Sequence, residues 1–234
     1  MNLKALHNHF ISHPESRWIM QYSNAVDLYN FIKNNPIKRV LGLGTGVGFS
    51  DAVVALAWKD KGVEGELDSL EQYDKCIKLA GKLIPDELNK YIKIHKVNPT
   101  TFTSDKMPYQ ILSVYDQIPD NDYDLIINDG PSPFLDSEGN FAELPNGTIQ
   151  QMTIDGKIKP NTFVIYDGRV SSLSILERYL GENFYLVKIP PRGSDFVILQ
   201  KKDCPLIVKD ERLKGYQKNS TYFKNHEKDS VSGH

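Results

Sequence analysis

Glycine occupies every second position of the segment 44–48, which directly follows the short apolar run Arg39–Leu43. Glycine allows sharp backbone turns and lets a ligand approach where a Cβ atom would clash. Helical spacing begins at Phe49, so the order is strand, glycine loop and helix, which is typical of nucleotide sites. The dinucleotide spacing G-x-G-x-x-G fails in both registers, because its last position falls on Val47 or Phe49. A tight connection without a ligand is the alternative interpretation.

An acidic residue, Glu71, follows the second predicted strand, 66–70, and lies 25 residues after Gly46. In doubly wound sheets an acid at this place lies beside the first glycine loop. A carboxylate offers two acceptor oxygens, which match the two hydroxyl groups of a ribose. Glu71 alone is equally well explained as a solvated acid at the start of a helix. Taken with the glycine loop, it favours adenosine binding.

Two aspartates, Asp129 and Asp167, each end an apolar run, 123–128 and 162–166 respectively. Open α/β sheets bind their ligands at the carboxyl ends of the strands. A carboxylate there is suited to removing a proton from a substrate, and two of them are suited to holding Mg²⁺. Each aspartate is also followed by glycine, as a simple turn at a strand end would be.

The elements that position these residues alternate between strands and helices. Apolar spacing predicts a helix over 25–34 capped by Asn24, one from Phe49 capped by Ser50 or Asp51, and others over 76–84 and 171–180, with weak helical character over 109–115. The last two strand runs, 185–189 and 196–199, are joined by six residues, too few for a parallel crossover. We therefore expect a doubly wound, mostly parallel α/β sheet that ends in an antiparallel hairpin.

Composition excludes several classes of protein. The longest apolar stretch, 52–58, is far shorter than the roughly 18 residues of a membrane span, and the N-terminal segment lacks the apolar core of a signal peptide. Two cysteines cannot form a disulfide framework, which favours a reducing compartment. The net charge of −2 shows no basic excess for nucleic acid. These features predict a cytoplasmic protein without membrane or nucleic-acid partners.

Taken together, the motifs resemble those of class I S-adenosylmethionine-dependent methyltransferases. The matching segments are 40–48 for the first motif, 69–72 for the ribose acid, Asn98 after the third strand, 123–130 for the fourth strand and 164–168 for the fifth. The resemblance covers about residues 24–202 and is closest to the small-molecule O-methyltransferase branch, in which the fourth and fifth strands both end in Asp. It implies a Rossmann-like sheet of seven strands with the last strand antiparallel.

The resemblance also implies roles for single residues. S-adenosylmethionine would contact the glycine loop and the residues after the second and third strands, namely Gly44, Thr45, Gly46, Glu71, Gln72 and Asn98. The predicted catalytic residues are Asp129, which would orient or deprotonate the acceptor, and Asp167 beside it. Arg169 would pair with Asp167 or with an acidic group of the substrate.

Three departures from the family pattern bear on these roles. The family usually has Asp or Glu two residues before the first loop glycine, where it helps to hold the methionine end of the cofactor, and this chain has Gly42 there. Either another residue holds that end, or affinity is weak, or the fold has lost its cofactor. The Asp-Asn pair that binds metal in catechol-type enzymes is here Asp167 and Gly168, so Mg²⁺ is not favoured. The fourth strand lacks the Pro-Pro-aromatic segment of enzymes that methylate bases.

We therefore expect a methyltransferase that methylates an oxygen atom of a small molecule. The alternatives are a non-catalytic adenosine-binding module on the same fold, and an aminopropyl transferase or NAD-linked enzyme on a related sheet. We divide the chain into an N-terminal cap (1–23), the methyltransferase-like domain (24–202) and a polar tail (203–234). The turn-rich segment 131–161 is either a lid or a packed excursion. A histidine cluster, His7, His9 and His13, lacks supporting metal ligands and is expected to be solvated.

Overall fold

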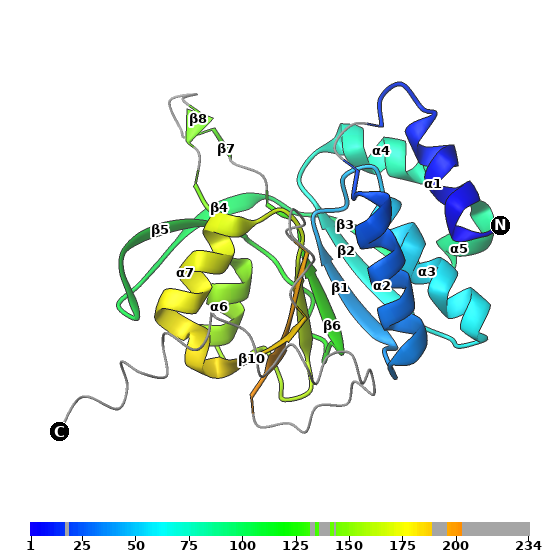
Figure 1. The fold of residues 1–234 in the computed structure, drawn as a ribbon. Helices are drawn as coiled ribbons and strands as arrows, with labels where there is room; N and C mark the ends of the chain where they lie inside the picture. The colour runs from blue at the N-terminus through cyan, green and yellow to red at the C-terminus, as the bar shows by residue number, and fades with distance from the viewer. Residues whose placement is uncertain (17–18, 132–133, 136–140, 143, 189–195, 203–234) are drawn as a thin grey trace.

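The computed structural model of the protein describes residues 1–16, 19–131, 134–135, 141–142, 144–188 and 196–202 (Figure 1). The predicted tail lies outside these residues, as do parts of the segment 131–161. A seven-stranded sheet forms the centre, in the order β10-β11-β9-β6-β1-β2-β3. Its strands are β1 (Arg39–Leu43), β2 (Glu66–Glu71), β3 (Ile92–Lys96), β6 (Leu125–Asn128), β9 (Phe163–Tyr166), β10 (Phe184–Lys188) and β11 (Val197–Lys201).

The direction of the strands confirms the predicted architecture. Strands β1, β2, β3, β6 and β9 pair in parallel, whereas β11 pairs antiparallel with both β9 and β10. The chain is thus a doubly wound α/β sheet whose last two strands form an antiparallel hairpin. Among the described residues, no helix is both long and apolar enough to cross a membrane.

Two apolar layers cover the two faces of the sheet. The first contains the helices α1 (Leu3–Ile11), α2 (Tyr22–Asn34), α3 (Phe49–Lys61), α4 (Asp74–Leu83) and α5 (Asp86–Asn89). The second contains α6 (Thr148–Ile154), α7 (Val170–Leu180) and a separate hairpin of β4 (Pro99–Ser104) and β5 (Met107–Tyr115) (Figure 1). Because side chains alternate along a strand, Val40 of β1 faces the first layer and Leu41 and Leu43 face the second. Short elements complete the described chain: β7 (Phe134–Leu135), β8 (Phe141–Ala142) and the 3-10 turn Gly181–Asn183.

The segment 109–115 is a strand, so its predicted helical character is wrong. It belongs to β5, which pairs antiparallel with β4, for example Thr100 with Val114. Tyr109 and Tyr115 are aromatic and Ile111 and Val114 are β-branched, and both kinds of residue favour strands. The hairpin occupies the place between β3 and β6 where a doubly wound pattern usually has a helix.

Two predicted helix caps are also wrong. Helix α2 begins at Tyr22, so Asn24 lies inside it, where its side chain is buried. Helix α3 is preceded by Gly48 in a left-handed conformation, and the buried carboxylate of Asp51 points to the sheet. In both cases a polar side chain that favours a cap locally takes a partner from a distant strand or strand end.

The N-terminal helix α1 packs on the first layer through Leu6 and Phe10, which are fully buried. The predicted solvation holds for His9, which is exposed, whereas His7 and His13 are half-buried. The ring of His7 contacts the ring of Phe49 at a centroid distance of 5.4 Å, and Nε2 of His9 lies 2.9 Å from the carbonyl oxygen of Leu83. These contacts give the histidines a role in packing α1 against α3 and α4.

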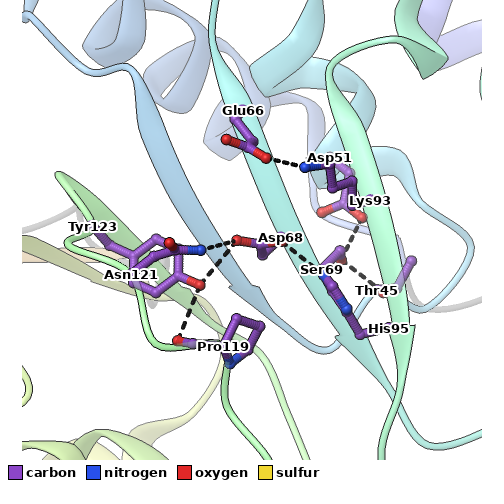
Figure 2. A network of polar contacts seen from close by, with 10 residues as sticks. All are labelled: Thr45, Asp51, Glu66, Asp68, Ser69, Lys93, His95, Pro119, Asn121 and Tyr123. Carbon is purple, nitrogen blue, oxygen red and sulfur yellow. Dashed lines mark hydrogen bonds and ion pairs between the residues drawn. The ribbon is translucent and has the colours of Figure 1, made fainter.

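A polar network on the second face of the sheet centres on Asp68 of β2 (Figure 2). Its carboxylate lies 2.7 Å from Nε2 of His95 and accepts hydrogen bonds of 3.0 Å from both Asn121 Nδ2 and Tyr123 OH. Asp68 is 4% exposed, so these partners replace the water that it would otherwise bind. The network joins β2, β3 and the segment before β6.

We expect Asp68→Ala to destabilise the protein by about 3 kcal/mol, because three donors lose one buried acceptor. Urea unfolding followed by circular dichroism measures this change. The matched control is Asp122→Ala, since the side chain of Asp122 is 77% exposed and lies 3.9 Å from Lys159; its expected effect is within about 0.5 kcal/mol. Equal losses in the two variants would contradict this role for the network.

Candidate cofactor and active site

The parallel strands bring the predicted site residues to one edge of the sheet. Leu43 at the end of β1 pairs with Leu70 of β2 and with Asn128 of β6, and Asn128 pairs in turn with Tyr166 of β9. The residues that follow these strands therefore lie next to one another. They are the glycine loop, Glu71, Asp129 and Asp167.

The glycine loop has the backbone conformation that its residues predict. Gly44, Gly46 and Gly48 have φ angles of +98°, +54° and +84°, which residues other than glycine rarely adopt. A Cβ atom at Gly44 would lie 3.0 Å from the backbone nitrogen of Gly130, so the loop packs directly on the turn after β6. The amides of Gly44 and Thr45 both donate to the carbonyl oxygen of Leu70. The loop is thus held between the ends of β2 and β6.

Glu71 lies beside the glycine loop, at the position that the sequence predicts for it. Its Oε2 accepts a 2.8 Å hydrogen bond from the amide of Gly46, and its Oε1 accepts bonds of 2.8 Å from the amides of Gln72 and Tyr73. Burial raises the pKa of Glu71 from its ordinary value, and these three amides act in the opposite direction. The carboxylate is therefore held in a defined orientation at the end of β2.

The two remaining predicted cofactor residues lie on the same edge, with partners of their own. The carbonyl oxygen of Gln72 accepts a hydrogen bond of 2.6 Å from Lys96. Asn98 is exposed, and its amide donates a 2.9 Å bond to the carboxylate of Asp116. This contact closes the base of the β4–β5 hairpin. A role for either residue in cofactor binding stays a prediction.

Asp129 pairs with Arg169, so the predicted pairing of Arg169 with Asp167 is wrong. The Nε and Nη2 atoms of Arg169 lie 3.0 and 2.8 Å from Oδ1 of Asp129, and Nη2 also donates to the Asp129 carbonyl oxygen. The reason is that Asp167 accepts a 2.9 Å bond from the side chain of Asn24 in α2. Arg169 instead reaches across to the neighbouring strand end.

The charges around Asp129 change its acidity. Desolvation raises its pKa to about 6, although 44% of its side-chain surface is exposed. Arg169 lowers this pKa, whereas Asp167 and Glu71 raise it. Asp129 is therefore a carboxylate that titrates much closer to neutral pH than an ordinary aspartate. Such a group is suited to accept a proton at physiological pH.

Sequence reasoning gave no role in the site to three residues at this edge: Tyr115, Ser69 and Asp51. Tyr115 ends β5, and its buried hydroxyl oxygen lies against Gly130. Desolvation raises its pKa well above the ordinary value, with Glu71 and Asp129 adding to the effect. Its place depends on the hairpin that the sequence did not predict. Ser69 and Asp51 form a buried hydrogen bond of 2.6 Å beneath the loop.

The described residues contain no group of three or more His, Cys, Asp or Glu side chains arranged to hold a metal ion. The absence of a metal at Asp129 and Asp167 stays a prediction.

The fold is shared with solved methyltransferases. The SAH-bound methyltransferase PaMTH1 of Podospora anserina has a TM-score of 0.55 at 14% identity, over 85% of this chain and 88% of that one. An O-methyltransferase of Bacillus cereus in complex with SAH has a TM-score of 0.53 at 13% identity, over 86% and 90%. A tRNA (m1A58) methyltransferase, TrmI of Aquifex aeolicus, has a TM-score of 0.52 at 14% identity, over 86% and 76%.

No family model matches the sequence, and no curated protein matches it. At identities of 13–14% the structural likeness establishes the fold. The chain has the fold of the class I S-adenosylmethionine-dependent methyltransferases, as the motifs predicted.

Proposed function

We propose that the protein is an S-adenosylmethionine-dependent methyltransferase that methylates an oxygen atom of a small molecule. The observation that supports this function best is the position of Glu71, whose carboxylate lies 2.8 Å from the amide of Gly46 in the glycine loop. A ribose acceptor beside a glycine-rich loop is what an adenosine ligand requires. The solved methyltransferases with the same fold, two of them bound to SAH, support the same choice.

The residues at this edge fit the cofactor. Gly44, Thr45 and Gly46 would hold it from the loop, Glu71 would accept hydrogen bonds from the ribose, and Gln72 and Asn98 would line the adenosine side. Bound there, the cofactor supplies a methyl group on a positively charged sulfur atom. Two acids, Glu71 and Asp129, lie at this edge and a third, Asp51, lies beneath the loop, so the charge of the site would complement that of a cationic ligand.

Asp129 would accept the proton of the acceptor hydroxyl group, because it lies at the end of β6 with a pKa near neutral. Arg169 would keep the Asp129 carboxylate in one orientation, and Asp167 would complete the acidic edge. The acceptor is proposed to be a small molecule, since the net charge of −2 offers no basic surplus for a nucleic acid. A cytoplasmic location is proposed because the chain contains only two cysteines.

The contact between Asp129 and Arg169 also favours a second candidate, a non-catalytic module that binds adenosine ligands. In that case the carboxylate is a structural partner of Arg169 and has no substrate to deprotonate. The two candidates share the same cofactor site. They differ only in turnover.

Ligand titration tests both candidates. S-adenosylhomocysteine at about 100 times its Kd is expected to stabilise the protein by about 2.7 kcal/mol, which corresponds to a rise in Tm of roughly 5–10 °C for a chain of this size. NAD⁺ is expected to give no comparable rise, because the loop lacks the dinucleotide spacing G-x-G-x-x-G. Methyl transfer from radiolabelled cofactor to a panel of phenols, catechols, hydroxy acids and tRNA then separates an enzyme from a binding module. A chain that binds none of these adenosine ligands contradicts both candidates.

A further inference from the structure

Gly42, on β1, has a carboxylate beside it that comes from another element. A Cβ atom built on Gly42 would lie 3.2 Å from Oδ1 of Asp51 and 3.1 Å from Oγ of Ser69, both closer than ordinary van der Waals contact. The space that a side chain at position 42 would enter is therefore taken by Asp51, from the first turn of α3. The Asp51 carboxylate can occupy this space because residue 42 is glycine and has no side chain.

Hydrogen bonds connect this carboxylate to the glycine loop (Figure 2). Ser69 Oγ donates a hydrogen bond of 2.6 Å to Asp51 Oδ2. Because the Ser69 hydroxyl hydrogen is used in that bond, Ser69 Oγ accepts the 2.7 Å hydrogen bond from Thr45 Oγ1. All three residues are buried. Asp51 thus lies beneath the loop that would hold the cofactor and is linked to one of its residues.

Among the residues that the structure describes, no cationic side chain acts on the charge of Asp51. Asp51 is 1% exposed, and the ionisable groups that influence it are Glu71 at the end of β2 and Asp129 after β6, both acidic. Desolvation, with these two acids adding to it, raises the pKa of Asp51 to about 7, although the hydrogen bond from Ser69 opposes the rise. Burying a carboxylate is costly unless a cation or strong donors accompany it.

We propose that Asp51 provides the carboxylate that stabilises the ammonium group at the methionine end of the cofactor, in the place beside Gly42; this inference rests on the proposed function. Glu71 would hold the ribose at the end of β2, so the methionine end extends toward β1 and the turn after β6. Asp51 is buried between these strands and the loop. Because Asp51 lies beneath the loop, its carboxylate would act on the ammonium group from the other side of the loop. Asp51 is therefore a positioning residue.

Binding measurements with two ligands test this role. S-adenosylhomocysteine carries the ammonium group, whereas 5′-methylthioadenosine has the same adenosine and sulfur without the amino acid part. Asp51→Asn is expected to weaken S-adenosylhomocysteine binding on the order of 10- to 100-fold, as for the loss of one charge-assisted interaction. Its affinity for 5′-methylthioadenosine should change less than about threefold. A structural role would weaken both ligands together.

A relocation variant keeps the test valid if changes at position 51 disturb the fold. Asp51→Ala removes the carboxylate oxygen that lies 3.2 Å from a Cβ atom built on Gly42, and Gly42→Asp in the same chain returns a carboxylate from β1. This double variant is expected to recover most of the S-adenosylhomocysteine affinity that Asp51→Ala loses. The matched control, Gly42→Ala with Asp51→Ala, fills the space without a charge and should recover none of it.

Stability of the ligand-free protein gives an independent reading. Because the pKa of Asp51 is about 7 in the folded chain and about 4 in an unfolded one, the folded state binds this proton more tightly. The stability contributed by Asp51 therefore falls as pH rises from about 4 to about 7. The side-chain amide of Asp51→Asn does not ionise, so this variant does not lose stability as pH rises. Asp51→Asn should therefore have a higher Tm than the wild type at pH 8 and no such advantage at pH 4.

The outcomes separate this inference from the function on which it rests. A wild-type chain that binds neither ligand overturns the proposed function and this inference with it. A wild-type chain that binds S-adenosylhomocysteine while Asp51→Asn binds it equally well overturns the inference alone. Equal weakening of both ligands in Asp51→Asn, or failure of Gly42→Asp to restore affinity over its alanine control, also overturns it.

Discussion

Glu71→Ala is expected to weaken S-adenosylhomocysteine binding at least about 100-fold, because two charge-assisted hydrogen bonds to the ribose would be lost, each worth roughly 1.5–3 kcal/mol. The carboxylate is already oriented by the amides of Gly46, Gln72 and Tyr73, so a ligand would meet it without a conformational change. Isothermal titration calorimetry measures the loss directly. Unlike Asp51→Asn, this variant should weaken 5′-methylthioadenosine to the same extent, since both ligands carry the ribose.

The control for Glu71 lies at the other end of the same strand. Glu66 forms a surface ion pair with Lys93 and is far from the glycine loop along β2. Glu66→Ala should bind both ligands like the wild type. Glu71→Gln tests whether the orientation of the side chain survives without its charge. In the wild type both carboxylate oxygens accept from backbone amides, whereas in the variant the side-chain NH₂ group would face one of these donors. If Glu71→Ala binds adenosine ligands normally, the proposed ribose site is wrong.

The central sheet could be predicted because its strands are signalled locally. The runs 39–43 and 162–166 are mostly apolar, the run 66–70 alternates polar residues with leucine, and the three are followed by Gly, Glu or Asp. The final hairpin follows from the length of its connection alone. For the same reason Glu71 could be placed beside the loop, since the geometry of parallel strands fixes which ends meet.

The errors arise where a distant partner outweighs a local preference. Asn24 and Asp167 are separated by 143 residues, and Arg169 and Asp129 by 40, so no spacing in the sequence reveals either contact. The β5 strand depends on β4 for its hydrogen bonds, which a local pattern of apolar residues does not report. Asp51 is informative only when the space beside Gly42 is known. The contacts between side chains of different helices and strands could therefore not be predicted from the sequence.

The carboxylate of Asp129 tests whether the site performs chemistry. Asp129→Asn is expected to lower kcat by about 10²- to 10⁴-fold, the usual contribution of a general base, on the acceptor that the panel identifies. Its affinity for S-adenosylhomocysteine should stay within about threefold of the wild type, because the amide preserves the shape of the side chain. A variant that keeps full turnover would show that Asp129 is not the base and would leave it as the partner of Arg169.

The pH dependence of kcat tests how the charges of Arg169 and Asp167 act on the pKa of Asp129. With the pKa of Asp129 at about 6, the protonated carboxyl group cannot accept a proton, so kcat should fall about tenfold per unit below pH 6 and level off above about pH 7. Arg169 lowers this pKa, so Arg169→Met should move the fall to higher pH. Asp167 raises it, so Asp167→Asn should move the fall to lower pH. Opposite shifts in these two variants, with no such limb in Asp129→Asn, would assign the titration to Asp129; shifts in the same direction would assign it elsewhere.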